Sequence, residues 1–570
     1  MIIHYYTEGD IPEIKMSGNS IISKDENDLV TLEVQETDSS YRYLSIMAKP
    51  QLVLKFSLPA FIEIPLGAWC EFMGQTFTLN DPENIKKHGT RNIEYTMTMG
   101  TDEDLLSLYK LRNSVDHRLK FSMCATPREF IQEIVASLNE RSAGGWSVGT
   151  CIQSTEKTIE FNHSYIDDAL QSVADTFGTE WEIVNKAISL RKVEYFKDNP
   201  LSLSYGKGNG FMPGVGRTSL SDEKPIKRLY IQGGDRNIDY SKYHSKELLL
   251  PKGQSLEYEG RTYKTDDDGY YIERLDVISD AVKEDSLDLS EIYPSRIGTI
   301  SSVVVVDASK NFYDIVDSSI PNELNYENYL IEGETMTIIF QDGMLAGKEF
   351  ECKYIHEAVT ITNNDGTTTT KAARRFEIVP QEIDGIIMPN STYAPAVNGK
   401  YIVFGCSLPD SYVCDNVNKV GASWDMFREG VRYLYEHEEQ KFTFTGTLQG
   451  LWAKQNWENV GGHLKVGGYI LFTDTQFAPA GKLIRITGIK EFLTSPYTPT
   501  IEISSSVSGV TTSSKMKKID NVDVLIEEMN KNALSFTKRR FRDAKETIEM
   551  LNDLMDAGFD NFTNGINPIT

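Results

Sequence analysis

The pattern of apolar and polar positions is helical in two stretches between residues 126 and 178. Thr126, Pro127 and Glu129 have the residue types of an N-cap, a first helical position and the acidic partner of a capping box. Apolar residues then recur at about one helical turn until Gly144; they are Phe130, Ile131, Ile134, Val135 and Leu138. We predict a helix that starts at Pro127 and ends before Gly144.

A second helix is predicted over residues 164–178, with Asp167 in its first turn. Its apolar stripe consists of Ile166, Leu170, Val173 and Phe177. Two alternating stretches, 181–184 and 187–193, are separated by a polar pair, which is typical of a β-hairpin. Residues 126–193 therefore predict a compact α/β module, and none of its motifs has the pattern of a reaction centre.

Most of the remaining chain alternates between apolar and polar residues, with glycine and proline at the turns, as β-strands do. We expect a mostly β, α+β protein of several domains, as its 570 residues also suggest. The expected parts are a first β domain at 1–111 completed by 201–235, the inserted α/β module at 112–200, an irregular insertion at 236–294, a second β domain at 295–405, a mixed α+β domain at 406–505 and a linker at 506–514.

Residues 515–570 are predicted to form a coiled-coil helix and a tail, with one long helical pattern of coiled-coil spacing over 516–558. The phase of the pattern slips near Arg539-Arg540 and then resumes, as at a stutter. A helix folded back on its own domain is the alternative, but a long helix after a linker favours self-association. The predicted seam consists of Ile519, Val522, Ile526, Met529, Ala533, Phe536, Phe541, Ala544, Ile548, Leu551 and Met555.

Composition narrows the class of protein. A net charge of −25 argues against binding along nucleic acid, which requires a basic footprint. The six cysteines are scattered without a CxxC pair, so we expect free thiols and no zinc site. The sequence lacks an apolar run long enough to span a membrane, and residues 1–10 lack the pattern of a secretory signal.

Candidate chemical motifs are better explained as turns. The segment GMLAGKE at 343–349 resembles a phosphate loop, but its glycine spacing is one residue short and Glu349 replaces the required Ser or Thr. TDDDG at 265–269 lacks the ligand spacing of a calcium loop. We therefore expect no metal and no cofactor.

Catalytic constellations are equally weak. The histidines do not cluster, and a nucleophile elbow of the GxSxG type does not occur. Cys124 or Cys151 with His163 could form a thiol–base pair, but both cysteines lie in patterns that favour burial. We predict a non-enzymatic protein, although two converging carboxylates of a glycosidase leave no signature in a sequence.

The order of parts resembles the baseplate-hub and tail-tip family of phage tails, which includes the N-terminal region of tail-associated lysins. The resemblance is carried by LVLKFSLPAFIEIPLGAWCEFMGQTFTL at 52–79, by ALQSVADTFGTEWEI at 169–183 within the module at 121–193, and by LYIQGG at 229–234. Later segments such as IIFQDGMLAGKEFE at 338–351 are similar to those of prophage tail proteins.

The resemblance implies a homotrimer in which two β-barrel-like hub domains per chain form a ring of six. We expect these domains at 1–111 with 201–235, and at 295–405. The ring would join the tail tube to the tip spike or fibre and let DNA pass at genome ejection. Implied partners are the tail-tube or distal tail protein, the tape-measure protein and a spike or fibre protein at the C-terminus. The implied location is the virion tail tip, after assembly in the bacterial cytoplasm.

Two other functions remain open at this stage. A tail-associated hydrolase of the host envelope would require a cleft with two carboxylates. A receptor- or glycan-binding fibre protein would require exposed aromatic rings, for which Trp424, Trp452 and Trp457 are the candidates. Core packing is the commoner role of such residues.

Overall fold

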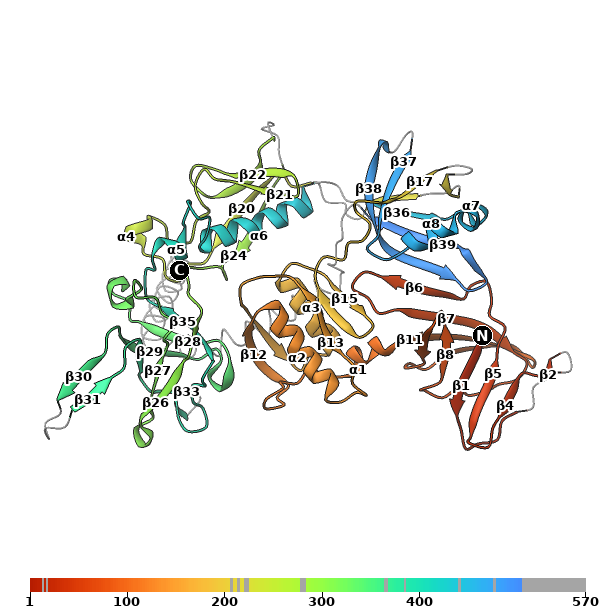
Figure 1. Cartoon of the computed structure of the whole chain (residues 1–570), viewed down its shortest axis with the longest axis horizontal. Coiled ribbons are helices and arrows are strands. Elements are labelled where there is room, and N and C mark those ends of the chain that lie inside the picture. The colour runs from red at the N-terminus through yellow and green to blue at the C-terminus, as the bar shows by residue number, and fades with distance from the viewer. Residues whose placement is uncertain are drawn as a thin grey trace, which may run out of the picture. The chain divides into compact units, whose positions relative to one another are not determined.

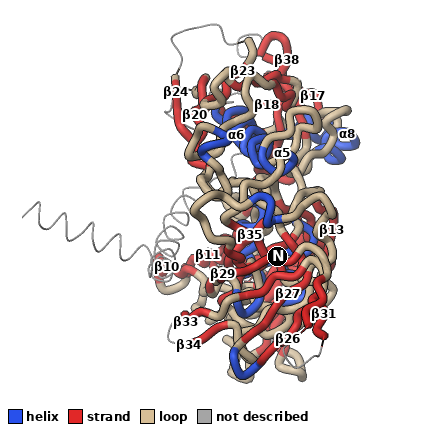
Figure 2. Tube along the Cα trace, turned by 90° about the vertical axis from the view of Figure 1, so that its left-hand side faces the viewer, coloured by secondary structure: helices blue, strands red, loops and turns tan. Residues whose placement is uncertain are grey.

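The computed structural model describes residues 1–504, with gaps at 13–14, 17–18, 206–208, 213–215, 220–224, 277–282, 363–367, 384–385, 439–441 and 475–477. These residues form two compact units. The first contains Met1–Pro294 and the segment that starts at Asp410, and the second contains Ser295–Pro409. Figure 2 shows strands in red and helices in blue, and strands make up most of the regular structure. The fold is therefore mostly β, as expected.

The first β domain folds from residues 1–100 around one apolar core. Its sheet runs in the order β6-β7-β11-β9-β8-β1-β5-β4. The chain after β5 returns to β7 through a bridge between Glu36 and Phe56, and the Thr37 N–H donates to the Lys55 carbonyl. The sheet thereby encloses its core. The strands are β1 (Ile2–Tyr6), β4 (Ile22–Lys24), β5 (Leu29–Glu33), β6 (Tyr41–Ser45), β7 (Gln51–Leu58), β8 (Trp69–Phe72), β9 (Gln75–Thr78) and β11 (Asn92–Gly100), with β10 (Asn84–Gly89) beside β11 and a separate hairpin of β2 (Lys15–Met16) and β3 (Asn19–Ser20).

The α/β module follows directly. Helix α2 (Pro127–Asn139) starts where the pattern predicts, and its capping box is present, since the Thr126 N–H donates to Oε2 of Glu129 at 2.8 Å. Helix α3 (Ile166–Thr176) has Tyr165 as its N-cap, one residue after the predicted start at Ser164. The hairpin of β15 and β16 forms around its turn as predicted. The other elements are η1 (Asp102–Asp104), α1 (Leu105–Leu108), β12 (Lys120–Ala125), β13 (Ser147–Cys151), β14 (Lys157–Asn162), β15 (Trp181–Val184) and β16 (Ala187–Leu190).

The second β domain of this unit combines strands from distant parts of the sequence. Its sheet order is β18-β17-β37-β38-β39-β36-β19. A bridge between Phe211 and Leu448, with the Met212 N–H donating to the Thr447 carbonyl, closes this sheet on itself. In Figure 1 the yellow β17 lies among the blue strands β37 and β38. The elements are β17 (Leu201–Tyr205), β18 (Gly210–Phe211), β19 (Gly216–Ser219), β36 (Phe442–Thr447), α7 (Gly450–Gln455), α8 (Trp457–His463), β37 (Tyr469–Asp474), β38 (Ala478–Phe492) and β39 (Ser495–Ser504).

This pairing differs from the expectation that residues 201–235 complete the first β domain. Strand β17 pairs with β37 and β19 pairs with β36, so both belong to the second closed sheet. Strand β20 (Arg228–Gly233) pairs with β23 and β24 in a separate sheet. The alternating pattern predicts these strands but holds no information on their partners, because many strands share the same apolar alternation.

Residues 236–294 were expected to be irregular, but they contribute four strands to a five-stranded sheet in the order β21-β22-β23-β20-β24. Each of these short strands buries at most one apolar side chain, so the alternation is too brief to be recognised in the sequence. Helix α6 (Ala422–His437) packs on one face of the sheet. The elements are α4 (Tyr240–Tyr243), β21 (Ser255–Tyr258), β22 (Arg261–Thr265), β23 (Tyr271–Arg274), β24 (Glu284–Leu289) and α5 (Asp410–Val413).

The second unit contains a seven-stranded sheet in the order β25-β35-β28-β29-β32-β27-β26. Its interior holds a fully buried carboxylate, Asp317, which accepts hydrogen bonds from Arg296 at 2.9 Å and from the Tyr401 hydroxyl at 2.7 Å. The elements are β25 (Gly298–Thr299), β26 (Ser302–Asp307), η2 (Ala308–Lys310), β27 (Phe312–Val316), η3 (Tyr326–Tyr329), β28 (Thr337–Phe340), η4 (Gly343–Leu345), β29 (Glu349–Ile355), β30 (Val359–Thr362), β31 (Thr368–Lys371), β32 (Arg375–Ile378), β33 (Gln381–Ile383), β34 (Ile386–Met388) and β35 (Lys400–Phe404).

Candidate functional site

The predicted oligomerisation seam lies outside the described residues. This applies to each of its members, from Ile519 to Met555, and to the linker before them. The coiled coil therefore stays a prediction from the sequence.

The motifs that resemble small-ligand sites form turns in the structure. The segment 343–349 connects β28 to β29 through η4, and Gly347 has a φ of +71°, which a turn requires. The carboxylate of Asp266 accepts the backbone N–H groups of Tyr270 at 2.7 Å and Tyr271 at 2.9 Å, so it fixes the loop between β22 and β23. Neither segment gathers metal ligands. A search of the described ranges finds no group of three or more His, Cys, Asp and Glu residues able to hold a metal ion.

The candidate thiols differ in burial. Cys124 is buried on β12, Cys151 is half-buried on β13, and His163 is exposed after β14. Burial raises the pKa of the Cys151 thiol above its ordinary value. A raised pKa lowers the fraction of reactive thiolate, which is the opposite of what a nucleophile requires.

The two tryptophan candidates whose side chains are described do not form an exposed platform. Trp424 on α6 is fully buried and packs against Phe427, so its role is in the core. Trp452 is partly buried against the core of the second β domain. The side chain of Trp457 is outside what the structure describes. Among the described helices, none is long and apolar enough to cross a membrane.

The strongest candidate for a functional arrangement is the junction of the two closed β sheets. The first half of β38 pairs with β37, and its second half pairs with β6, from Gly488 opposite Ser45 to Phe492 opposite Tyr41. One long strand is therefore shared by both β domains. Arg42 donates to Glu491 across this pair at 2.7 Å, and the Lys490 ammonium lies 3.8 Å from the centre of the Tyr41 ring.

A buried ion pair attaches the α/β module to the second β domain of the first unit, which contains β17 and β38. Arg485 on β38 donates to both carboxylate oxygens of Glu180, at 2.7 and 2.9 Å, and to the Val193 carbonyl at 2.8 Å. The Val193 N–H in turn donates to Glu180 at 2.8 Å. Because both charges are buried and share several hydrogen bonds, the contact fixes the module in one position against the sheet.

Glu194 adds a second polar contact at the same place. The pKa of its carboxyl lies below the ordinary value. Burial alone would raise this pKa, but the hydroxyl of Tyr469 and the ammonium groups of Lys192 and Lys197 lower it by more. The same contact and burial raise the pKa of Tyr469. The charged form of Glu194 therefore stabilises the contact between the module and the sheet.

A third contact joins the module to helix α6. The Lys157 ammonium donates to the Thr176 carbonyl at 2.9 Å and to Glu429 at 3.3 Å. Glu429 is also bound by Arg432 at 2.6 Å. Sequence reasoning missed all three contacts, because their partners come from elements far apart in the sequence, such as Glu180 and Arg485, and no motif marks them.

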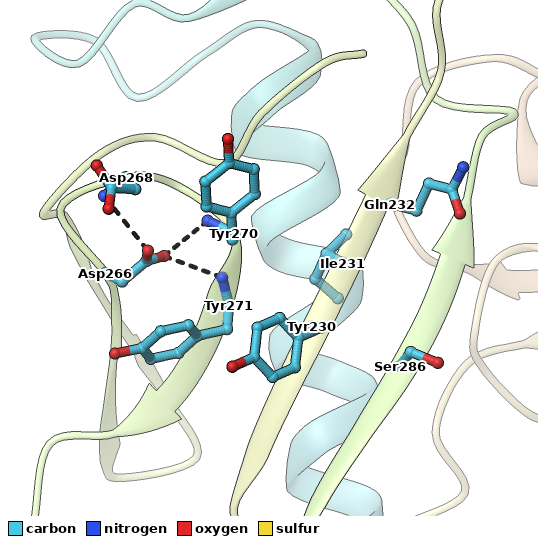
Figure 3. A pocket seen from close by; sticks show the side chains of 8 residues that line it. All are labelled: Tyr230, Ile231, Gln232, Asp266, Asp268, Tyr270, Tyr271 and Ser286. Carbon is cyan, nitrogen blue, oxygen red and sulfur yellow. Dashed lines mark hydrogen bonds between the residues drawn. The ribbon is translucent and has the colours of Figure 1, made fainter. Parts of the chain in front are cut away.

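A shallow pocket opens on the five-stranded sheet (Figure 3). Tyr230 on β20 lies opposite Tyr271 on β23, and their ring centres are 5.4 Å apart. Asp266 holds the adjoining loop as described above. Within this pocket Tyr270 is 52% exposed and Tyr230 is 38% exposed. The sequence does not indicate the aromatic pair, which arises from the register of two strands.

The chain is similar to known proteins in structure but not in sequence. No family model matches the chain, and no curated protein matches its sequence. Chains similar in structure include prophage tail protein gp18 from Listeria monocytogenes, with a TM-score of 0.39 and 9% identity over 91% of this chain and 98% of that chain. The 43 kDa tail protein of prophage MuSo2 from Shewanella oneidensis has a TM-score of 0.39 and 9% identity over 88% and 97%.

A further similar chain is c3393 from E. coli, a component of the type VI secretion system with similarity to the T4 tail proteins gp27 and gp5. It has a TM-score of 0.24 and 9% identity, and the match covers 55% of this chain and 92% of that chain. The similar structures thus include prophage tail proteins and a type VI secretion component that itself is similar to T4 tail proteins. These scores are too low to define a shared fold over the whole chain.

Proposed function

We propose that this protein is a structural, non-enzymatic baseplate-hub or tail-tip protein of a phage or prophage tail. In this role it forms a homotrimeric ring that joins the tail tube to the tip spike or fibre and lets DNA pass. Its partners are the tail-tube or distal tail protein, the tape-measure protein and the spike or fibre protein. The resemblance of residues 121–193 and of the flanking β segments supports the proposal.

One structural observation supports it most strongly. Two β domains, each with a sheet that encloses its own core, share the long strand β38 and are joined through its pairing with β6. A trimer would then carry six such domains, which is the number that a ring on a sixfold tail tube requires. The short bridges at Glu36 and at Phe211 close the two sheets in comparable ways.

This arrangement suggests a different assignment of the ring domains. We propose residues 1–100 as the first and residues 201–219 with 442–504 as the second. The domain at 295–405, which the sequence favoured, is the alternative second member. The strand β38 is shared by the two proposed ring domains, so it would hold them at a fixed distance. Residues 295–409 form a separate unit and, in the described part of the chain, share no strand with the first β domain.

The solution mass of the purified full chain tests the proposal. One chain has a mass of 64.4 kDa. We expect a trimer of about 193 kDa, three times this value. A version ending at Ser514 lacks the predicted seam, so the helix no longer contributes to association. This version should already dissociate at protein concentrations at which the full chain is still a trimer. A mass of one chain at every concentration, for both versions, would contradict the proposal.

A further inference from the structure

On one face of the five-stranded sheet, the described residues of its own unit place no helix. Helix α6 packs on the opposite face, where Ile231 and Ile272 lie so close that a Cβ on Gly430 would be 2.6 Å from the Ile272 side chain. Side chains alternate along a strand, so the neighbours Tyr230 and Tyr271 point away from α6. Their rings are therefore accessible to a ligand.

The two aromatic rings lie on neighbouring strands, and a serine continues the row on a third strand. Tyr230 on β20 lies opposite Tyr271 on β23 and beside Ser286 on β24. The two rings are inclined at 59° with centres 5.4 Å apart. The pocket that they bound with Tyr270 and Gln232 has a volume of about 500 Å3 and is wide open to solvent. This volume lies within the roughly 300–1,000 Å3 of small-molecule sites.

The rings are held in place before any ligand arrives. The guanidinium of Arg228 lies 4.6 Å from the centre of the Tyr271 ring and is itself fixed by Glu284 at 2.9 Å and by Glu273. Asp266 binds the backbone N–H groups of Tyr270 and Tyr271. A site whose side chains are already ordered loses less entropy on binding than a mobile one.

The polar groups at the rim are mostly uncharged. Within the described part of the chain, the hydroxyls of Tyr230, Tyr270, Tyr271 and Ser286 and the carboxylate of Asp268 have no hydrogen-bond partner. Such a set offers donors and acceptors for a ligand with many hydroxyl groups. The C–H faces of a sugar ring, in turn, pack on the electron-rich face of a tyrosine.

We propose that this pocket, defined by Tyr230, Tyr270, Tyr271, Gln232, Asp268 and Ser286, binds one or two sugar rings of an uncharged saccharide. A cationic ligand finds one face of the Tyr271 ring already occupied, because the Arg228 guanidinium lies on it. An entirely apolar ligand would leave the hydroxyls and the Asp268 carboxylate desolvated without partners. The site goes beyond the proposed role in the tail and does not depend on it.

Saturation-transfer NMR on the full chain tests this site. The probes are maltose, cellobiose, lactose and N,N′-diacetylchitobiose, which cover α- and β-linked neutral hexoses and N-acetylated hexosamines. We expect at least one of them to receive saturation on its ring C–H protons. Tyr230→Ala and Tyr271→Ala should weaken its binding by about tenfold or more, since each removes one stacking surface.

Tyr240→Ala is the matched control, because Tyr240 lies on α4 in the same unit, is 62% exposed and is not part of the pocket. This variant should bind the saccharide as the unchanged chain does, and all variants should keep the same thermal unfolding midpoint. The proposal is overturned if none of the four disaccharides binds. It is also overturned if Tyr230→Ala binds as tightly as Tyr240→Ala, or if tetramethylammonium competes for the pocket better than the disaccharides.

Discussion

The α/β module and the second closed β domain each fold around an apolar core but are assembled in opposite ways. The module gathers its helices and strands from one continuous stretch, between Leu105 and Leu190. The second β domain combines β17, β18 and β19 with strands that follow more than two hundred residues later. Its core cannot form until both segments are present, whereas the core of the module depends mainly on its own stretch.

This difference explains what could be read from the sequence. Capping residues, helical stripes and a hairpin turn are local signals, so the starts of α2, α3, β15 and β16 were predicted within two residues. Helix α2 and strand β16 end three to five residues earlier than predicted. The partner of β17 is set by a contact between distant segments, for which a single sequence has no local signal.

The largest effect is expected from separating the parts. Residues 101–195 expressed alone should fold with a cooperative thermal transition, since the core of the module lies almost entirely within them. Residues 442–504 expressed alone should not, because β17 and β18, with buried Leu201, Leu203 and Phe211, are missing from the core. Circular dichroism and backbone NMR would measure both. Cooperative unfolding of the second fragment would show that its distant strands are dispensable.

A smaller but still large effect is expected from Arg485→Met. The variant leaves the Glu180 carboxylate buried without its ion pair, which costs about 3–5 kcal/mol of unfolding free energy. The double variant with Glu180→Gln should recover much of this loss, because the buried charge is then absent. Urea unfolding of the full chain measures both. A loss below about 1 kcal/mol for the single variant would mean that the pair behaves like an exposed one.

The smallest effect concerns pH. Because the pKa of Glu194 is lowered in the folded protein, its contribution to stability is present above its unfolded pKa, about 4.3, and is lost as the pH falls through the folded value. Glu194→Gln should therefore lower the urea midpoint more at pH 7 than at an acidic pH below the folded pKa. Lys482→Gln, on the same β domain, is the control. An equal effect of Glu194→Gln at both pH values would contradict this assignment.

The candidate sites, like the fold, include local features that the sequence predicts and long-range contacts that it does not. Local turn chemistry accounts for the segments at 265–269 and 343–349, as the sequence indicated. The tyrosine pair and the ion pair of Glu180 with Arg485 depend on strand register and on long-range contacts. Their residue types are common throughout the chain, so the sequence does not distinguish them from ordinary surface and core residues.

Electron cryo-microscopy of the assembled full chain tests the central claim most directly. Our account predicts a ring with threefold symmetry and an open channel, in which the β domain at 1–100 alternates with the β domain at 201–219 and 442–504. Density showing single chains, an assembly without a channel, or a ring that excludes either β domain would contradict the proposed hub.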